Sequence, residues 1–199
     1  MSEYYLIASA GPCAVVEVSD HNEHYINYKA CARPPSEPIR IYETFKPEGD
    51  YEIPEFVHTK VDALSKRVVM EAGLQYIYGI HWVPAFIKNS KGHRDYLFIN
   101  YLQELKCLDL DKSEYSRVNA FGGVSGLRKI VIDEKFLAET PLNQRLIFMM
   151  EEDAHILFHR TIVERIMATN PINTTFIPCV DTEKMDRQSI TNWSTPKAN

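Results

Sequence analysis

The sequence predicts an α+β fold: two strand–helix–strand units that form an internal pseudo-repeat share one mixed sheet, and a β-rich N-terminal segment covers an edge. Three observations lead to this prediction. The 199-residue chain is 45% hydrophobic and 25% charged, a balance typical of a globular protein with a core. Two capped helix patterns are each followed by a strand of the same type. Short apolar runs separated by Pro and Gly fill the N-terminal part.

We divide the chain into three parts. Residues 1–55 form the β-rich N-terminal segment, in which residues 4–8 and 13–18 resemble strands joined by a turn at Gly11 and Pro12, and residues 39–45 form a further strand. Residues 56–180 form an α+β domain that holds the repeat. Residues 181–199 have little apolar periodicity, so we expect a flexible C-terminal tail.

The helices are predicted from their caps. Thr59 and Asp62 have the spacing of a capping box, apolar residues recur at helical spacing after them, and Gly73 suits the position just beyond a helix end. This predicts a helix over about residues 60–72. A second box, Thr161 to Glu164, starts another helix, which ends before Asn170 and Pro171 because proline cannot continue it.

Strands fill the intervals between the helices. Residues 82–87 and 96–101 should pair as a hairpin across the turn-forming residues 89–92. Further strands are expected at residues 127–132, 146–150, 155–158 and 174–180. The two helical units align with each other when residues 56–62 are matched to 158–164, and this match is the basis of the predicted repeat.

Charge and composition narrow the function. With 22 basic and 27 acidic side chains the formal net charge is -5, which disfavours binding to phosphate backbones and would steer a basic partner. The first residues have neither a basic region nor a long apolar run, so no signal peptide is expected. No apolar run approaches the roughly 18 residues of a membrane span. We therefore expect a cytoplasmic protein that binds neither nucleic acid nor membrane.

The four cysteines are far apart in the sequence and form no C-x-x-C pair: Cys13, Cys31, Cys107 and Cys179. Each lies beside apolar residues. We expect buried thiols in a reducing compartment rather than disulfides.

No catalytic motif emerges. On a helix, Glu151, His155 and His159 would share a face with the spacing of metal ligands. If residues 155–158 instead form a strand, the two histidines lie about 13 Å apart, too far to share one ion. The glycine-rich residues 121–129 match neither a phosphate-binding loop nor a nucleophile elbow. We therefore expect no catalytic residues, no metal site and no cofactor.

A resemblance arises from the order of several short segments. These are the two helix entrances, the Trp82–Pro84 and Phe176–Pro178 strands, residues 96–100, residues 127–132 and, most specifically, the Leu-Asp-Leu-Asp-Lys-Ser-Glu-Tyr run at residues 108–115. In this order the chain resembles the eleventh immunity-protein family of bacterial polymorphic toxin systems over roughly residues 54–180. It departs from the family pattern at His58, His159 and Arg160.

The resemblance implies a cytoplasmic protein that neutralises a toxin by binding it. Acidic residues beside an aromatic suit such a contact with a basic toxin, because aromatic side chains supply much interface energy. The residues expected to bind the partner form two clusters: Asp109, Asp111, Glu114 and Tyr115; and Glu151, Glu152 and Asp153. Two alternatives remain: a metal-dependent hydrolase using Glu151, His155 and His159, and an adaptor or chaperone that loads a secreted effector. The sequence does not specify the oligomeric state.

Overall fold

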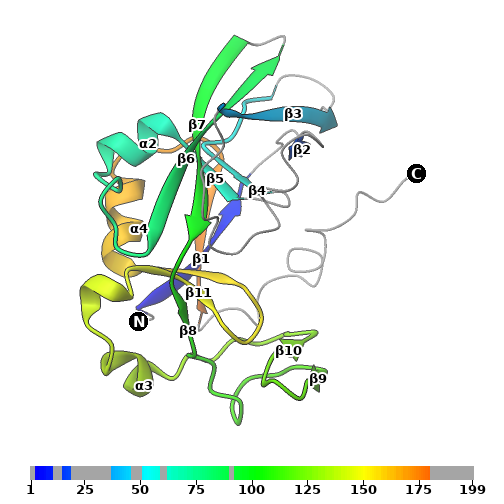
Figure 1. Cartoon of the computed structure of the whole chain (residues 1–199), viewed down its shortest axis with the longest axis vertical. Helices are drawn as coiled ribbons and strands as arrows, with labels where there is room; N and C mark the ends of the chain where they lie inside the picture. Colours follow the sequence, from blue (N-terminus) through cyan, green and yellow to red (C-terminus); the bar gives the residue numbers. More distant parts are fainter. Residues whose placement is uncertain are drawn as a thin grey trace.

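A computed structural model describes residues 3–10, 15–18, 37–45, 51–58, 62–89 and 92–179 (Figure 1). Within these ranges, no helix is long and apolar enough to cross a membrane. The α-helices are α2 (Lys66–Glu71), α3 (Glu134–Ala138) and α4 (Arg160–Met167), with a 3-10 turn η2 (Leu142–Gln144). The strands are β1 (Tyr4–Ser9), β2 (Val15–Val18), β3 (Ile39–Phe45), β4 (Phe56–His58), β5 (Asp62–Ser65), β6 (Ile80–Asn89), β7 (Gly92–Tyr101), β8 (Glu104–Leu105), β9 (Arg117–Val118), β10 (Val124–Ser125), β11 (Ile147–Met150), β12 (Ile156–His159) and β13 (Thr174–Pro178).

Two sheets carry most of the strands. One has the order β13-β1-β12-β11-β8 and the other β2-β3-β6-β7-β5-β4. Each sheet is mixed, because the β8–β11 and β3–β6 pairs are parallel while the other pairs are antiparallel. The predicted α+β class and mixed pairing are confirmed. The expectation of one shared sheet is wrong, since each strand–helix–strand unit has a sheet of its own.

The N-terminal strands do not lie where the sequence placed them. β1 runs between β12 and β13, with Leu6 opposite Ile177 on one side and Tyr5 opposite Phe158 on the other. It is therefore an inner strand and not the cover of an edge. β2 lies at the edge of the other sheet, so β1 and β2 do not pair as a hairpin. The turn at Gly11 and Pro12 lies outside the described residues.

The internal repeat is present and is larger than predicted. Each copy is an antiparallel hairpin, a helix and a strand: β4-β5-α2-β6 in the first, β11-β12-α4-β13 in the second. In each copy the hairpin and the final strand lie on either side of one further strand. That strand is β7 in the sheet of the first copy and β1 in the sheet of the second copy. The four-strand orders β6-β7-β5-β4 and β13-β1-β12-β11 thus correspond strand by strand.

The helix starts correct the predicted alignment of the repeat. Residues 62–65 form β5, so the first helix begins six residues later than the predicted start, at Lys66. Its cap is Ser65, whose hydroxyl accepts a hydrogen bond from the backbone N–H of Val68 at 3.3 Å. The cap of α4 is His159 rather than Thr161. Matching cap to cap pairs Ser65 with His159, whereas the sequence alignment had paired Thr59, outside the described residues, with Thr161.

One apolar core joins the two copies. It includes Leu64 and Val68 from the first copy and Phe158 and Ile162 from the second. The helices α2 and α4 lie beside each other on the same side of the sheets (Figure 1). Arg165 of α4 donates hydrogen bonds to the carbonyl oxygens of Ala72, at 2.8 Å, and Gly73, at the end of α2. As predicted, Gly73 ends the helix with a positive φ of 62°.

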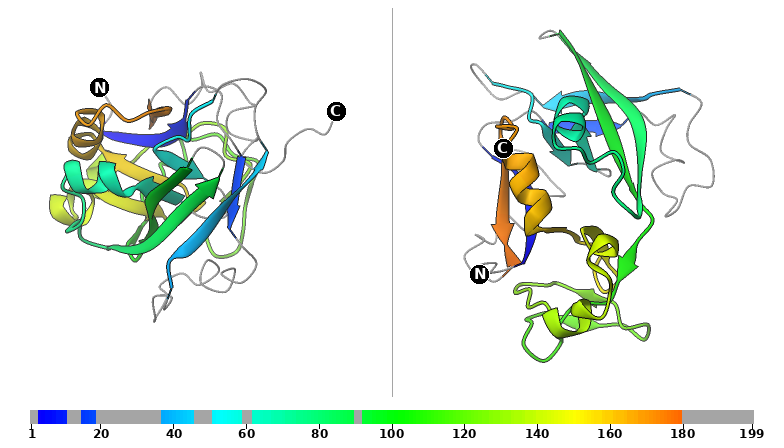
Figure 2. Two further views of the ribbon diagram at one scale, coloured as in Figure 1. Left: turned by 90° about the horizontal axis from the view of Figure 1, so that it is seen from above. Right: turned by 90° about the vertical axis from the view of Figure 1, so that its left-hand side faces the viewer.

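Residues 106–146 form a lobe with little regular structure, which we call the loop-rich lobe (Figure 2, right view, lower part). The strand predicted at residues 127–132 is not formed there. That stretch makes only isolated bridges, Leu108 with Ile132 and Glu114 with Lys129. Two further apolar cores lie in the described residues. The second packs around strands β3, β6 and β7. The third fixes the lobe to the sheet that contains β1, since it joins Leu108 and Leu137 of the lobe to Phe148 and Leu157. Residues 181–199, the predicted tail, lie outside the described residues.

Candidate functional site

Three consecutive acidic residues between β11 and β12 have three different environments. Glu151 is exposed, and its carboxylate lies 3.6 Å from the ammonium of Lys106. Glu152 turns inward, where one oxygen accepts hydrogen bonds from the backbone N–H groups of Cys107 and Leu108 at 2.9 and 3.1 Å. Asp153 is buried against His155. Only Glu151 therefore presents its carboxylate to solvent as the sequence analysis expected for this cluster.

The other predicted cluster lies in the loop-rich lobe. Asp109 accepts a hydrogen bond from the Lys112 ammonium at 2.5 Å, which lowers the pKa of the Asp109 carboxyl. Tyr115 is half-buried against the third core. Asp111 and Glu114 are exposed. Because Glu152 bonds to residues 107 and 108, the structure brings the two predicted clusters together around the junction of the lobe with β11.

The candidate metal ligands are not brought together. His155 precedes β12 and His159 ends it, so an extended strand separates them. The His159 side chain caps α4 by accepting a hydrogen bond from the backbone N–H of Thr161, and its ring meets Tyr4 edge-on. Among the residues that the structure describes, no group of three or more His, Cys, Asp or Glu side chains is arranged to hold a metal ion.

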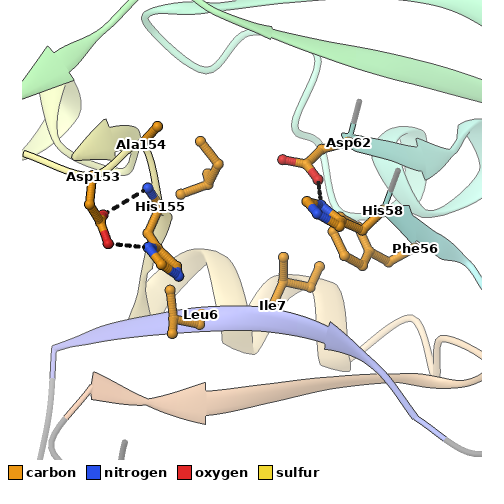
Figure 3. A pocket seen from close by; sticks show the side chains of 9 residues that line it. Leu6, Ile7, Phe56, His58, Asp62, Asp153, Ala154 and His155 are labelled. Carbon is orange, nitrogen blue, oxygen red and sulfur yellow. Dashed lines mark hydrogen bonds and ion pairs between the residues drawn. The ribbon is translucent and has the colours of Figure 1, made fainter. Parts of the chain in front are cut away.

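A cavity of about 270 Å³ lies between strands β4 and β5 of the first copy and the β11–β12 connection of the second (Figure 3). β1 supplies its floor, the β4–β5 hairpin one wall, and the β11–β12 connection the opposite wall. The lining residues are Leu6, Ile7, Phe56, His58, Asp62, Asp153, Ala154, His155 and Ile156. The cavity is thus built by segments that are far apart in the sequence.

Each wall carries a histidine held by an aspartate. Nδ1 of His155 lies 2.5 Å from one carboxylate oxygen of Asp153, whose other oxygen accepts a hydrogen bond from the backbone N–H of His155 at 3.1 Å. Nδ1 of His58 likewise pairs with one carboxylate oxygen of Asp62. Figure 3 shows the two pairs on opposite sides of the cavity.

Tyr101, at the end of β7, also binds the aspartate of the His58–Asp62 pair. Its hydroxyl donates a hydrogen bond of 3.2 Å to the second oxygen of Asp62. Burial and the nearby carboxylate raise the pKa of Tyr101 well above its usual value, so the hydroxyl keeps its proton and remains a donor. Both aspartates thus use both carboxylate oxygens to fix a neighbouring group.

The sequence analysis missed this cavity. The sequence placed Asp153 on a partner-binding surface, considered His155 only as a ligand in the alternative of a metal-dependent hydrolase, and treated His58 only as a departure from a family pattern. A local signal is that a histidine and an aspartate lie within four residues of each other, His58 with Asp62 and Asp153 with His155, but His93 and Asp95 show similar spacing outside the cavity lining. That signal becomes informative only when the pairing of β4 with β5 and of β11 with β12 is known.

In comparisons with known proteins, no family model matches this chain, and no curated protein matches it.

Proposed function

We propose that the protein is an immunity protein that binds a cognate bacterial toxin and neutralises it by occluding it. The proposal rests on the ordered segments that resemble the eleventh immunity family, above all the run at residues 108–115. That run lies in the loop-rich lobe, where Leu110, Asp111, Lys112 and Glu114 are exposed while Leu108 is buried. Long irregular segments fixed to a rigid sheet are where proteins commonly carry binding residues.

The exposed side chains of the lobe are the observation that supports this proposal best. Phe121 is 92% exposed, and four more large apolar side chains of the lobe are also exposed: Leu110, Val118, Phe136 and Leu142. Asp111 and Glu114 lie in the same lobe. We infer that these side chains belong to one binding surface, because apolar patches rimmed by polar residues commonly mark sites that bind another protein. We therefore assign toxin binding to the lobe, with Phe121, Asp111 and Glu114 as its contacts.

Co-expression tests this assignment. The toxic C-terminal domain encoded beside the gene is expressed with the wild-type protein, with Phe121→Ala, or with the charge-reversed double variant Asp111→Lys and Glu114→Lys. We expect the wild type to restore growth, and both variants to restore it at least tenfold less well.

Tyr76→Ala is the matched control. Tyr76 is 90% exposed, like Phe121, but it follows α2 and lies outside the lobe. This variant should protect as well as the wild type. Equal protection by the wild type and both lobe variants would contradict toxin binding by the lobe. Cell death with the wild-type protein would contradict the immunity function for that toxin.

A further inference from the structure

The β9–β10 hairpin of the loop-rich lobe presents an aromatic side chain to solvent. Phe121 lies in the turn between the two strands and is 92% exposed, and residues 116–122 are all exposed. Figure 1 shows β9 and β10 at the lower end of the molecule. A single exposed apolar side chain is ordinary on a protein surface, so its significance depends on how the chain holds it.

Hydrogen bonds fix the turn that carries Phe121. The side-chain oxygen of Asn119 accepts bonds from the backbone N–H groups of Phe121, at 2.8 Å, and Gly123, at 3.0 Å. Backbone bonds close the same turn, from Asn119 to the carbonyl oxygen of Gly123 at 2.8 Å and from Gly122 to that of Asn119 at 3.1 Å. Gly122 has a φ of 85°, which glycine adopts without steric cost. The backbone of this turn therefore has little conformational freedom to lose when a partner binds.

The hairpin is also attached to the sheet that contains β1. The backbone N–H of Val124 in β10 donates to the carbonyl oxygen of Glu152, in the β11–β12 connection, at 2.6 Å. The Glu152 side chain accepts bonds from the backbone N–H groups of Cys107 and Leu108 at the start of the lobe. One residue beside the sheet thus holds the lobe at two places, and the sheet supports the hairpin from which Phe121 projects.

The residues of this hairpin are basic, in contrast to the chain as a whole. Residues 116–129 contain Arg117, Arg128 and Lys129 but no aspartate or glutamate, whereas the formal net charge of the chain is -5. Arg117 lies in β9, Arg128 follows β10, and both are exposed. The two arginines thus stand on either side of the turn in the sequence. A partner surface that fits the hairpin should carry negative charge around an apolar centre, because interfaces pair opposite potentials.

We propose that the hairpin inserts Phe121 into an apolar pocket of the partner toxin, and that carboxylates on the rim of this pocket contact Arg117 and Arg128. The proposal rests on the proposed function, because it names the part of the toxin surface that the lobe recognises. An aromatic side chain on a turn of fixed conformation suits such a contact, since the ring is buried with little ordering of the backbone. The toxin should therefore be acidic at this place, even if it is basic as a whole.

Fluorine nuclear magnetic resonance follows the ring itself. 4-Fluorophenylalanine takes the place of Phe121 in the full-length protein, and the purified toxin domain is added. In the free protein the fluorine signal should shift between light and heavy water, because the ring is exposed. In the complex we expect a new signal without this solvent shift, because the ring is buried in the pocket. A signal that keeps its solvent shift in the complex would overturn the proposal.

Two alanine variants distinguish a pocket from a flat contact. Phe121→Ala should weaken toxin binding about thirtyfold or more in calorimetric titration, as expected for an aromatic anchor in a pocket. Leu142→Ala is the comparison, since Leu142 is also a large apolar residue of the lobe and is 45% exposed. It should weaken binding about threefold or less. Similar losses for the two variants would contradict the pocket, because a flat apolar surface would distribute the contact energy over both residues.

Charge reversal tests the acidic rim. The double variant Arg117→Glu and Arg128→Glu should bind the toxin about tenfold more weakly than the wild type. The control is Lys66→Glu with Lys88→Glu, which changes the net charge equally at exposed residues of α2 and β6, outside the lobe. The control should bind within about threefold of the wild type. Equal changes in the two double variants would show an effect of the net charge alone and would contradict the rim.

Co-expression with the toxin separates this proposal from the immunity function. If the wild type protects cells and the fluorinated ring stays exposed in the purified complex, the inserted side chain is contradicted while the immunity function stands. If the wild type neither protects cells nor binds the toxin in the calorimeter, the immunity function is contradicted, and this proposal with it. The expected result is protection by the wild type together with a buried ring in the complex.

Discussion

The His159 side chain combines two tasks that restrict its protonation. It is buried against Tyr4 and caps α4 through Nδ1, which accepts the backbone N–H of Thr161 at 3.2 Å. A protonated Nδ1 could no longer accept this bond. Burial is the main cause that lowers the pKa of His159 below its usual value of 6.5. The folded state thus prefers the neutral ring.

This preference predicts a loss of stability in mild acid. Below about pH 6.5 the ring takes up a proton in the unfolded chain but not yet in the folded protein, so the unfolded state binds more protons. The free energy of unfolding should therefore fall as the pH drops from about 6.5 through the lowered pKa of the folded state. His159→Asn keeps a capping side chain without this titration and should flatten the decrease. Urea unfolding of the wild type and of His159→Asn at pH 7 and pH 5 measures the two decreases in the free energy of unfolding. Equal decreases in the two proteins would contradict the role of His159.

Burial also determines the protonation of the two cysteines in the described residues, Cys107 and Cys179. Burial raises the pKa of the Cys107 thiol well above its usual range and that of Cys179 to about 12. As the sequence predicted, Cys107 is a buried free thiol, and the thiol of Cys179 is also buried. Cys13 and Cys31 lie outside the described residues.

Because the thiolate is the reactive form, neither buried cysteine should react with a thiol-modifying reagent in the folded protein. Digestion followed by mass spectrometry after labelling at pH 8 should find Cys107 and Cys179 unmodified. Both should be modified when labelling is done in denaturing urea. Rapid modification of Cys107 in the folded protein would contradict its burial.

Local sequence patterns predicted which segments carry charge but not which way the charges face. Glu151, Glu152 and Asp153 are alike in sequence, yet backbone N–H groups of residues 107, 108 and 155 turn the second and third inward. Those donors come from other segments or from a tight turn in which Ala154 has a φ of 65°. No periodicity in the sequence contains this information. Of the seven residues predicted to bind a partner, only Asp111, Glu114 and Glu151 are exposed.

At the scale of elements, the same limit explains the misplaced helix start. Thr59 and Asp62 satisfy the rule for a capping box, and the stretch from Val61 to Ala72 has helical spacing. In the folded chain Ala63 and Leu64 pair with β4 on one side and β7 on the other. Strand pairing to distant segments outweighs the local preference, and the helix starts where the pairing stops. The helix end at Gly73 was predicted well because it depends on one residue alone.

The contact between α2 and α4 makes a prediction at this scale. Arg165 donates to two carbonyl oxygens that the end of α2 leaves without helical partners. Arg165→Ala should reduce the free energy of unfolding by about 2 kcal/mol, the usual size for hydrogen bonds to a charged group. Arg160→Ala, which removes only an exposed pair 3.8 Å from Glu164, should cost about 0.3 kcal/mol. Equal losses in urea unfolding would contradict the role of Arg165.

At the scale of the whole molecule, the two copies of the repeat depend on one shared core. Phe158 is fully buried within it and also meets Phe176 edge-on. Phe158→Ala should reduce the free energy of unfolding by about 4 kcal/mol. Phe136→Ala in the loop-rich lobe, where the side chain is 48% exposed, should cost far less. Far- and near-ultraviolet circular dichroism should report one common transition, and two separate transitions would contradict a shared core.

The class of fold was predictable because it depends on composition and on the order of elements. The division into two sheets was not, since it requires knowing that β1 inserts between β12 and β13 some 150 residues later in the chain. The cavity follows from the same long-range arrangement, because its floor is β1 and its walls come from the two copies. The sequence therefore indicated residues of the lobe as candidates for partner binding, but it did not indicate the cavity.

A titration of the toxin domain with this protein tests whether the protein neutralises the toxin by binding it. The purified toxin domain is held at a fixed concentration, its activity is assayed, and the wild-type protein is added stepwise. We expect the toxin activity to fall linearly and to reach its minimum at one equivalent of the protein. Binding that leaves the toxin fully active would instead identify an adaptor, and either that result or a failure to bind would contradict the proposed immunity function.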